Sequence, residues 1–319
     1  MGEISMPVRF GLVGTGYWAR ELHAVGVAGH PDAELVGVWG RDPGKAAALA
    51  ETHGASGYSG SDGYDDMLAA VDAVVFSVPP DVQAPLAVRA AQAGRHLLLE
   101  KPVALSHAAA SEVADAVARA GVASVVFFTE RFVPEREDWL QERVAADTLG
   151  GAATWLASLR GPDNPFAGSQ WRQQQGGLWD VGPHALSVLL PVLGPVTSVA
   201  GARGREDLVH LVLTHENGAT STVALSLTMP PDATRAGLAF YDEHGWHTRP
   251  DTEQAASGDA VSHQRRAIGE LVENLRAGGT EHRVDVRFGA EVVRVLELAQ
   301  QVVDAGGQVH AGPMVTPTL

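Results

Sequence analysis

The sequence predicts an α/β protein with two domains: a doubly wound parallel sheet over residues 1–128 and an α+β domain over residues 129–319. Three observations lead to this prediction. Short apolar segments alternate with Ala-rich helical segments through the first domain, and a glycine-rich turn follows the first of them. After residue 129, strands begin to follow one another directly. Repeated β-α-β units form parallel sheets, whereas consecutive strands form antiparallel or mixed ones.

Five apolar segments of the first domain are predicted to be buried strands. They are Val8–Val13, Glu34–Trp39, Ala73–Val78, His96–Leu99 and Ala123–Phe128. Three segments between them carry apolar residues at helical spacing and are predicted helices, Lys45–His53, Val82–Ala93 and Ala108–Ala120. The ligand site of such a sheet lies at the carboxyl ends of its strands.

The second domain begins with a predicted helix, Arg131–Val144, followed by a Gly-, Pro-, Asn- and Gln-rich loop, Gly161–Gly177. The strands Asp207–Thr214 and Ala219–Thr228 are joined by a His-Glu-Asn-Gly turn. Residues 232–260 are weakly patterned and fit strands with long loops. Two amphipathic helices close the chain, Val261–Ala277 and Phe288–Ala305. An arrangement in which the last helix packs back on the first domain stays open.

Composition and charge exclude several classes of function. A chain of 319 residues is long enough for two domains. It has no apolar run of membrane-spanning length and no visible secretory signal, so we expect a cytoplasmic protein. The absence of cysteine excludes disulfides and thiolate chemistry, and a net charge of −15 opposes binding to nucleic acid or anionic membranes. No metal is expected, because the remaining histidines lack ligand spacing: His210, His215, His244 and His247.

The turn Gly14–Ala19 follows the first strand directly and opens a helix. Backbone N–H groups in such a turn face a pyrophosphate, with the helix dipole behind them, and the small Ala19 lets the helix pack close to the strand. A plain tight β-α turn is the alternative, but the position at the first strand of a β-α-β series favours a dinucleotide site. The residues assigned to this cofactor site are Gly14, Thr15, Gly16, Tyr17 and Trp18.

The end of the second strand distinguishes NAD from NADP. An NAD site places an acidic residue there for the ribose 2′-hydroxyl, whereas an NADP site offers an arginine to the 2′-phosphate. Asp42 precedes Pro43 at a predicted helix start, so capping accounts for it without a cofactor. Gly40 and Arg41 therefore occupy the discriminating positions, and we favour NADP(H) over NAD(H), although an arginine there is also an ordinary surface residue.

The turn Ser77–Pro80 leaves the sheet next to the glycine turn, across the point where the strand order reverses. A Pro-rich turn is often only a connection, and Asp81 is suited to cap the helix that follows. The position of the turn nevertheless makes Ser77 and Pro79 candidate walls of a nicotinamide pocket.

Two short segments, Glu100-Lys101-Pro102 and Asp180–His184, carry the candidate catalytic groups. Oxidising an alcohol requires a base for the hydroxyl proton while hydride leaves the carbon. His184 titrates in the right range, Lys101 would stabilise the developing alkoxide or relay the proton, and Asp180 would orient the imidazole. Residues four apart share a helical face if the helix begins by Asp180, but a start at Pro183 weakens that argument. The alternatives are that Asp180 only caps a helix and that His184 is a buried, hydrogen-bonded core residue.

The chain resembles the Gfo/Idh/MocA oxidoreductase family over nearly its whole length. Four segments carry the resemblance: Val8–Gly16, Ala90–Pro102, Arg131–Pro134 and Gly176–His184. The resemblance implies an NAD(P)-binding Rossmann domain and a second domain built on a large, mostly antiparallel sheet. The face of that sheet often forms the oligomer interface, which implies a homodimer or homotetramer. It also implies a Lys-Pro peptide bond that is often cis.

By the same resemblance, the family's catalytic lysine, aspartate and histidine fall on Lys101, Asp180 and His184, with the lysine between nicotinamide and substrate. Further cofactor contacts are expected at Gln83, Glu100, Trp171 and Arg172. Substrate contacts are expected at Thr129, Glu130, Arg160 and His184, although polar loop residues are usually solvated surface.

Departures from the family pattern bear on the substrate. The family commonly has Asn and His where this chain has Pro80 and Gln83, and Asn where it has Thr129. It commonly has an acidic residue three positions after the histidine, where this chain has Ser187. Ser187 therefore argues against carrying over inositol-type specificity.

The sequence as a whole predicts an NAD(P)-dependent dehydrogenase or reductase that transfers hydride between nicotinamide and a hydroxyl or keto carbon of a sugar, cyclitol or related polyol. Two alternatives stay open. One is an NAD-dependent, redox-assisted glycoside elimination or hydrolysis, which some relatives perform. The other is a non-catalytic nucleotide-sensing regulator on the same fold, against which the retained Lys/Asp/His set argues.

Overall fold

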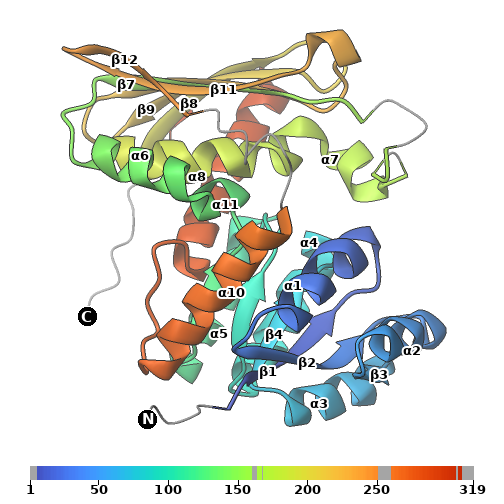
Figure 1. The fold of residues 1–319 in the computed structure, drawn as a ribbon. Coiled ribbons are helices and arrows are strands. Elements are labelled where there is room, and N and C mark those ends of the chain that lie inside the picture. The colour runs from blue at the N-terminus through green and yellow to red at the C-terminus, as the bar shows by residue number, and fades with distance from the viewer. Residues whose placement is uncertain (1–5, 160–163, 167, 251–259, 307, 311–319) are drawn as a thin grey trace. The chain divides into compact units, whose positions relative to one another are not determined.

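The computed structural model describes residues 6–159, 164–166, 168–250, 260–306 and 308–310 (Figure 1). Their contacts divide the chain into two units. Residues up to Val133, with those from Glu253 to Val293, form the first unit. Residues from Pro134 to Thr252, with those from Arg294 onward, form the second. The first unit is therefore built from two separate stretches of the chain.

The first unit contains a six-stranded sheet in the order β3-β2-β1-β4-β5-β6, with every neighbouring pair parallel. Its strands are β1 (Val8–Val13), β2 (Ala33–Trp39), β3 (Ser56–Tyr58), β4 (Ala73–Phe76), β5 (His96–Leu99) and β6 (Ser124–Val126). The strand order reverses between β1 and β4, which is where a doubly wound sheet forms its ligand crevice. This sheet confirms the predicted parallel, doubly wound class of the first domain.

Helices connect these strands. The turn after β1 leads into a π-helical turn, Ala19–Ala24, and then into α1 (Val25–Ala28); the others are α2 (Pro43–Thr52), α3 (Gly60–Ala70), α4 (Pro80–Gln92) and α5 (His107–Ala120). All residues of β4 are buried, and Arg9 is the exposed residue of β1. Burial on both faces explains why these strands are continuous apolar runs in the sequence.

The sequence did not predict β3 and α3. The three residues of β3 are not fully buried, so their sequence carries no apolar pattern. α3 buries Tyr64, Met67 and Leu68 from an otherwise polar, Gly-containing segment. Met67 packs against Gly11 in β1, where a Cβ atom would lie 3.0 Å from the Met67 sulfur.

A C-terminal stretch completes the first unit. It contains α10 (Ala260–Arg276), which buries Ile268 and Leu271, and the start of α11 (Val286–Ala305). The backbone N–H of Val126 donates to the carbonyl of Val284 at 2.8 Å, so this stretch continues the hydrogen bonding of β6. Residues from the far end of the sequence thus belong to the core of the N-terminal fold.

The second unit is built on a seven-stranded sheet in the order β12-β11-β7-β10-β9-β8-β13. Its strands are β7 (Gly150–Leu156), β8 (Val196–Arg203), β9 (Val209–His215), β10 (Thr220–Ser226), β11 (Arg235–Asp242), β12 (Gly245–Thr248) and β13 (Gln308–His310). β7 and β10 pair in parallel, and the other neighbours are antiparallel. The prediction of a large, mostly antiparallel sheet is confirmed.

One face of this sheet is covered by helices, as Figure 1 shows for α6 (Pro134–Val144) and α8 (Gly182–Leu193). On β9, residues alternate between buried and exposed, with Leu211 and Leu213 facing the helices and Val212 46% exposed on the other side. A two-sided pattern of this kind is normal for an antiparallel sheet with one face packed. We call the opposite face, which includes His210, Val212, Thr222 and Ala224, the open face.

The predicted helix over 131–144 is divided by Pro134 into a 3-10 turn, Thr129–Phe132, and α6. Within the segment predicted as a loop, residues 170–177 instead form the start of α7 (Gln170–Asp180). That helix contains one non-helical residue, Gly176, at φ 66° and ψ −165°. The glycine permits this conformation because it has no Cβ.

Candidate functional site

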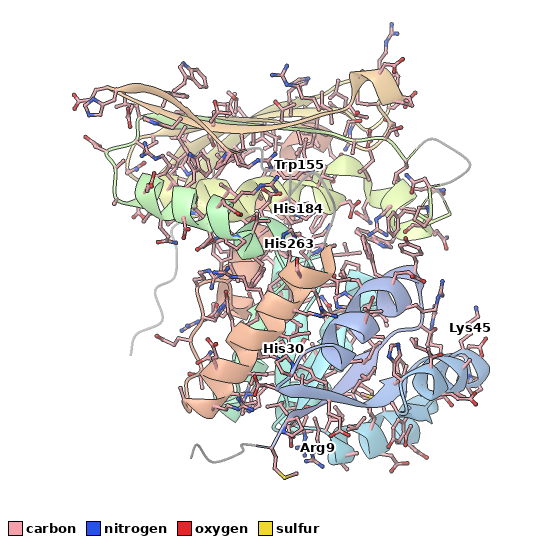
Figure 2. The ribbon with its side chains drawn as sticks, viewed as in Figure 1. Arg9, His30, Lys45, Trp155, His184 and His263 are labelled. Carbon is pink, nitrogen blue, oxygen red and sulfur yellow. The ribbon has the colours of Figure 1, made fainter. Side chains whose placement is uncertain are left out.

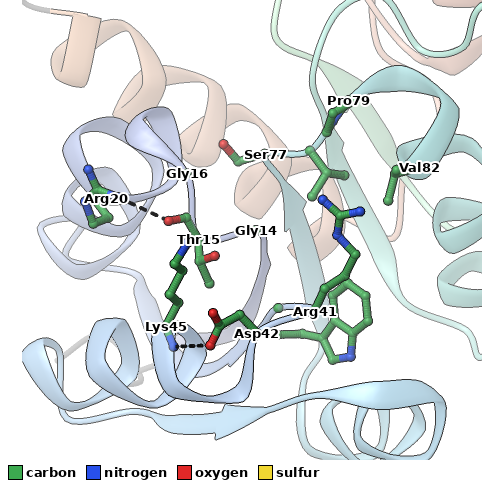
Figure 3. A pocket seen from close by; sticks show the side chains of 13 residues that line it. Gly14, Thr15, Gly16, Arg20, Arg41, Asp42, Lys45, Ser77, Pro79 and Val82 are labelled. Carbon is green, nitrogen blue, oxygen red and sulfur yellow. Dashed lines mark hydrogen bonds between the residues drawn. The ribbon is translucent and has the colours of Figure 1, made fainter. Parts of the chain in front are cut away.

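A cavity of about 610 Å³ opens in the first unit where β1, β2 and β4 end, and Figure 3 shows its walls. It is lined by the glycine turn, the end of β2 with the start of α2, and the Pro-rich turn after β4. The lining residues are Gly14, Thr15, Gly16, Arg20, Trp39, Gly40, Arg41, Asp42, Lys45, Ser77, Val78, Pro79 and Val82. Seven of the predicted cofactor residues are among them: Gly14, Thr15, Gly16, Gly40, Arg41, Ser77 and Pro79.

Gly14 joins the three strand ends. Its φ of +131° suits glycine, and a Cβ there would lie 2.3 Å from the carbonyl oxygen of Ser77. Its N–H donates to the carbonyl of Trp39 at 2.9 Å, and the N–H of Ser77 donates to the carbonyl of Val13 at 2.8 Å. The turn therefore lies directly against the neighbouring strand ends, and any larger residue at position 14 would open the cavity floor.

Gly16 differs from Gly14, because a Cβ at position 16 would meet no protein atom within 4 Å. Its lack of a side chain leaves the space in front of the turn open to a ligand. The next turn of helix starts here, since the N–H of Arg20 donates to the carbonyl of Gly16. A dinucleotide pyrophosphate fits this arrangement of exposed backbone and helix start.

The predicted cap is present at the end of β2. Asp42 Oδ1 accepts a hydrogen bond from the N–H of Lys45 at 3.0 Å, with Pro43 in the first turn of α2. Gly40 is tightly placed, because a Cβ there would lie 2.7 Å from Cγ2 of Thr15. The position directly after the strand thus holds no acidic side chain, and the carboxylate nearest to it is engaged in capping.

Two cationic residues of the cavity were missed by sequence reasoning, Arg20 and Lys45. Figure 3 shows Lys45 extending from α2 toward Thr15, and Arg41 reaching from the end of β2 toward Pro79. The signal for Lys45 was its rarity, because the chain contains only two lysines, Lys45 and Lys101. The cavity wall therefore carries three cations and the single carboxylate of Asp42.

Tyr17, Trp18, Gln83 and Glu100 do not line this cavity. The rings of Tyr17 and Trp18 meet edge to face at 5.6 Å just beyond the glycine turn. The Gln83 side chain is fully buried in α4 and holds the segment that follows β5. Its amide nitrogen donates to the carbonyls of Glu100, Pro102 and Val103, and its amide oxygen accepts from the N–H of Glu100.

The segment Glu100–Val103 contains the cis peptide bond that the resemblance implied, between Lys101 and Pro102. Oε2 of Glu100 accepts from the backbone N–H of Lys101 at 3.2 Å. Oε1 of Glu100 lies 2.9 Å from Nε2 of His23, a buried residue that sequence reasoning missed. A histidine inside a helix offered no sequence signal of this pairing.

In the second unit, Asp180 and His184 lie on successive helices. Asp180 ends α7, Val181 follows, and α8 begins at Gly182 with Pro183 in its first turn. The case in which Pro183 starts a new helix is therefore the observed one, so the argument from spacing on a single helix does not apply. Asp180 is buried and its Oδ2 lies 3.1 Å from Nε of Arg172.

His184 packs face to face on Trp155 of β7, with ring centroids 5.3 Å apart and an angle of 20° between the planes. Figure 2 shows the two side chains next to each other. The guanidinium of Arg249 lies over the Trp155 ring at 5.4 Å. The imidazole is thus held by an aromatic contact that the sequence did not indicate.

Arg172 and Trp171 belong to the first turn of α7. The Arg172 guanidinium lies over the rings of Phe166 and Trp171, at 4.7 and 4.8 Å, while it pairs with Asp180. The sequence assigned both residues to the cofactor, and within the second unit the arginine contacts the proposed orienting carboxylate.

The predicted substrate residues Thr129 and Glu130 lie in the 3-10 turn after β6, where Glu130 is buried. Arg160 lies outside the described residues. Among the residues that the structure describes, no three His, Asp or Glu side chains are grouped so as to hold a metal ion. In the described part of the chain, no helix has the length and apolarity needed to cross a membrane.

Comparison with known proteins identifies the family. Residues 8–128 match the model of an oxidoreductase family with an NAD-binding Rossmann fold, GFO_IDH_MocA, and residues 138–246 match the model of a GFO/IDH/MocA C-terminal domain.

Individual relatives agree with this match. The chain is 27% identical to dTDP-3,4-didehydro-2,6-dideoxy-alpha-D-glucose 3-reductase of Streptomyces violaceoruber, over 95% of this chain and 88% of that protein. It is 29% identical to inositol 2-dehydrogenase of Rhizobium meliloti, over 69% of each chain. The WlbA dehydrogenase of Bordetella pertussis, solved with NADH and UDP-GlcNAcA, shares the fold with a TM-score of 0.80 at 22% identity, over 97% of this chain and 99% of that one. The chain therefore belongs to the Gfo/Idh/MocA oxidoreductase family and is a nicotinamide-dependent dehydrogenase or reductase.

Proposed function

We propose that the protein is an NADP(H)-preferring oxidoreductase that interconverts a hydroxyl and a keto group on a sugar, cyclitol or related polyol. The cofactor preference is argued from the cavity wall at the end of β2, where Gly40 and Arg41 directly follow the strand and the one carboxylate, Asp42, caps α2 through its Oδ1. Relatives named for a deoxysugar reductase and an inositol dehydrogenase support the substrate class.

The residues that line the cavity of the first unit hold the cofactor in this proposal. The N–H groups after Gly14 bind the pyrophosphate, and Ser77 with Pro79 forms a wall of the nicotinamide end. Arg41 and Lys45 bind the 2′-phosphate, since a guanidinium and an ammonium both favour phosphate oxygens. The bound nicotinamide supplies the hydride acceptor or donor. The residues of the chain supply orientation and proton transfer.

Lys101 and His184 divide the proton chemistry. Hydrogen bonds to the side chains of Gln83 and Glu100 fix the backbone at Lys101. The ammonium of Lys101 stabilises the developing alkoxide and relays the proton. His184 is the general acid/base, with its ring plane set by Trp155. Asp180 orients the imidazole and is itself held by its ion pair with Arg172.

The residue three positions after the histidine distinguishes this pocket from that of relatives with an acidic residue. Ser187 is fully buried, and its hydroxyl donates to the carbonyl of His184 at 2.8 Å. It holds the start of α8 and offers no acidic group to a substrate hydroxyl. This supports a sugar derivative whose recognition does not depend on that carboxylate.

The remaining features concern the whole molecule. We propose that the open face of the second sheet forms a homodimer or homotetramer interface, and that nucleic acids and membranes are not partners. The open face is hollowed by about 440 Å³ and lined with small residues such as Ala200, Ala202 and Ala224. We propose a cytoplasmic location on the composition alone.

The first test is nucleotide turnover by the purified protein against a panel of sugars, cyclitols and their keto forms, with NADP and NAD compared. Lys101→Ala and His184→Ala are expected to bind nucleotide and to lose at least about 100-fold in kcat, which is the size of a general acid–base contribution. His184→Ala should also flatten the pH dependence of kcat/KM. Arg9→Ala, an exposed change far along β1 from the cavity, is the control for both variants.

Each outcome of the panel has a defined meaning. Turnover that survives in Lys101→Ala would remove Lys101 from the mechanism. Tightly retained nucleotide with product formation and no net consumption of added cofactor would indicate the elimination reaction. Tight nucleotide binding without any turnover would indicate the sensor.

A further inference from the structure

A chain of hydrogen bonds runs through the interior of the first unit from α10 to the backbone of Lys101. Nε2 of Gln264 lies 3.3 Å from Nδ1 of His23, and Nε2 of His23 lies 2.9 Å from Oε1 of Glu100. The other carboxylate oxygen, Oε2, accepts from the N–H of Lys101 at 3.2 Å. His23 is 1% exposed and Gln264 is fully buried. Buried polar groups in such a chain have no water to replace a lost partner.

The direction of each hydrogen bond follows from the donors present. The amide nitrogen of Gln264 only donates, so Nδ1 of His23 accepts. The proton of the neutral imidazole then lies on Nε2 and is donated to Glu100. Gln264 thereby selects the tautomer of His23 that holds the carboxylate.

The backbone around Lys101 is held from the opposite side by Gln83. The Gln83 side chain bonds to Glu100 before the lysine and to Pro102 and Val103 after it. Lys101 therefore starts from a Cα whose neighbours are fixed on both sides. The hydrogen bonds of Gln83 do not fix the side-chain carboxylate of Glu100. That carboxylate is held by His23.

The local helix geometry explains how His23 reaches this carboxylate. His23 lies in the π-helical turn Ala19–Ala24, directly after the nucleotide-binding turn. π-helical turns are rare and occur often at functional sites. The His23 ring also lies edge-on to Phe127, at 6.2 Å between centroids. The imidazole is therefore held by two hydrogen bonds and one aromatic contact.

We propose that His23 is a positioning residue for Lys101, acting through Glu100, and that Gln264 fixes its tautomer. The proposal rests on the proposed function, in which Lys101 is the proton partner. With His23 in place, Oε1 of Glu100 is held by the imidazole. Without it, the carboxylate turns to the adjacent ammonium and draws it from the reacting oxygen.

The kinetic test compares two replacements of His23. His23→Phe keeps a ring of similar size and removes the donor, whereas His23→Gln keeps an N–H near the position of Nε2. We expect His23→Phe to lower kcat by about 10-fold or more, since small displacements of a catalytic group cost that much, with KM for nucleotide within about twofold. His23→Gln should restore most of the loss.

The control is His96→Phe. His96 begins β5, the strand that ends just before Glu100, and its Nδ1 accepts a hydrogen bond from the N–H of Ala123. This variant removes a partly buried histidine hydrogen bond from the same strand without touching Glu100. A loss of kcat equal to that of His23→Phe would reduce the effect to general destabilisation and overturn the proposal.

The two-lysine composition allows a second readout that needs neither substrate nor turnover. Protein labelled with carbon-13 at the lysine Cε alone gives two signals, and Lys45→Arg assigns them. In His23→Phe, and to a smaller degree in Gly26→Ala, the Lys101 signal should shift while the Lys45 signal stays in place. Gly26→Ala acts from outside the chain of hydrogen bonds, because a Cβ at position 26 would lie 1.4 Å from Oε1 of Gln264 and displace it.

These two measurements distinguish the positioning role of His23 from the proposed catalytic function of Lys101. An unchanged Lys101 signal in folded His23→Phe would overturn the positioning role, whatever the activity. A shifted signal, together with full activity of Lys101→Ala, would instead leave the positioning intact and remove the proposed function of the lysine.

Discussion

The proposed preference for NADP(H) depends on a few side chains around the end of β2. Asp42 is a carboxylate in the cavity wall, yet its Oδ1 is used by the N–H of Lys45. Arg41 and Lys45 carry the positive charge there. An acidic residue beside a nucleotide site is therefore an incomplete guide to NAD preference, because its hydrogen bonds decide whether it is available.

The guanidinium of Arg41 is expected to favour NADPH over NADH. Arg41→Ala should weaken NADPH binding by about 10-fold or more, since a hydrogen bond to a charged group contributes about 1.5 to 3 kcal/mol, and should change NADH binding by no more than about twofold. Lys45→Ala should have the same selectivity with a smaller loss. Isothermal titration with both nucleotides measures this, and Arg89→Ala on α4 serves as an arginine control. Equal losses for NADPH and NADH would cancel the phosphate assignment.

At the scale of elements, Asp207 fixes the second half of α7 to the end of β10. Its carboxylate accepts from the N–H groups of Gly177 and Leu227 and from the hydroxyls of Ser226 and Thr228. Burial alone would raise the pKa of Asp207, but these hydrogen bonds lower it below its usual range. The clamp lies one residue beyond the kink at Gly176 and so fixes the part of α7 that ends in Asp180.

Asp207→Asn should destabilise the protein by about 2 kcal/mol, because its amide nitrogen faces donors. The pKa of Asp207 is lower in the folded protein, so its stabilisation is present above the ordinary value of 3.8 and is lost as pH falls below it. The difference in melting temperature from wild type should therefore shrink in acid. Asp115→Asn, which changes an exposed carboxylate 3.9 Å from Arg119, is the control. A difference in melting temperature that does not change between pH 7 and pH 3 would refute this account.

A second clamp joins α10 to the end of the first unit's sheet. Glu270 pairs with His282 and Arg283, and Arg283 also donates to the carbonyl of Arg131. Burial would raise the pKa of Glu270, but the hydrogen bonds from His282 and Arg283 lower it to about 2. Its contribution is therefore full above the ordinary value of 4.5 and disappears as pH falls toward 2.

Glu270→Gln should accordingly lower the melting temperature at neutral pH and converge with wild type as the pH approaches 2. Thermal unfolding at several pH values measures this convergence. Glu281→Gln, at a carboxylate that is 81% exposed, should show little difference at any pH. Convergence well above pH 4.5 would mean that another group is responsible.

The sequence predicted elements where burial repeats with a clear period and failed where it does not. The strands with both faces buried, such as β1 and β4, appear as apolar runs, and the amphipathic helices α10 and α11 were placed within two residues. β7, β8, β11 and β12 were not predicted individually, because their sequences mix small, polar and aromatic residues. Edge and open-face positions need no apolar side chain, so periodicity is lost there.

The candidate site was likewise predicted in part and missed in part. Gly14, Gly16 and Gly40 were found because each directly follows a strand of a β-α-β series, and at Gly14 the backbone also requires glycine, with φ at +131° and Ser77 in close approach. His23 and Trp155 were missed, since each acts through a partner that is distant in sequence: Glu100 is 77 positions from His23. A single sequence shows the spacing of motifs, but it does not reveal which distant side chains the fold brings together.

At the scale of the whole molecule, the open face bears on assembly. Val212 is 46% exposed at the middle of the second sheet, beside the hollow lined by Ala202 and Ala224. Exposed apolar surface of this kind on a flat sheet is typical of an interface between subunits.

Val212→Glu should shift the protein from oligomer to monomer, because it buries an unpaired charge in each copy of the interface. Light scattering after size exclusion gives the mass directly. His244→Glu, in the exposed turn between β11 and β12, adds the same charge elsewhere and should leave the mass unchanged. A monomeric wild type would refute the proposed interface.

The division of the first unit between two stretches of chain has a consequence for biosynthesis. When residues 1–133 have emerged from the ribosome, the surface that Ile268, Leu271 and the backbone near Val284 will cover is still bare. The whole second unit's sheet up to β12 is made before that cover arrives. Domains made early in a chain usually complete their folding first. Here the nucleotide-binding unit can complete its core only after the sheet of the second unit up to β12 has been made.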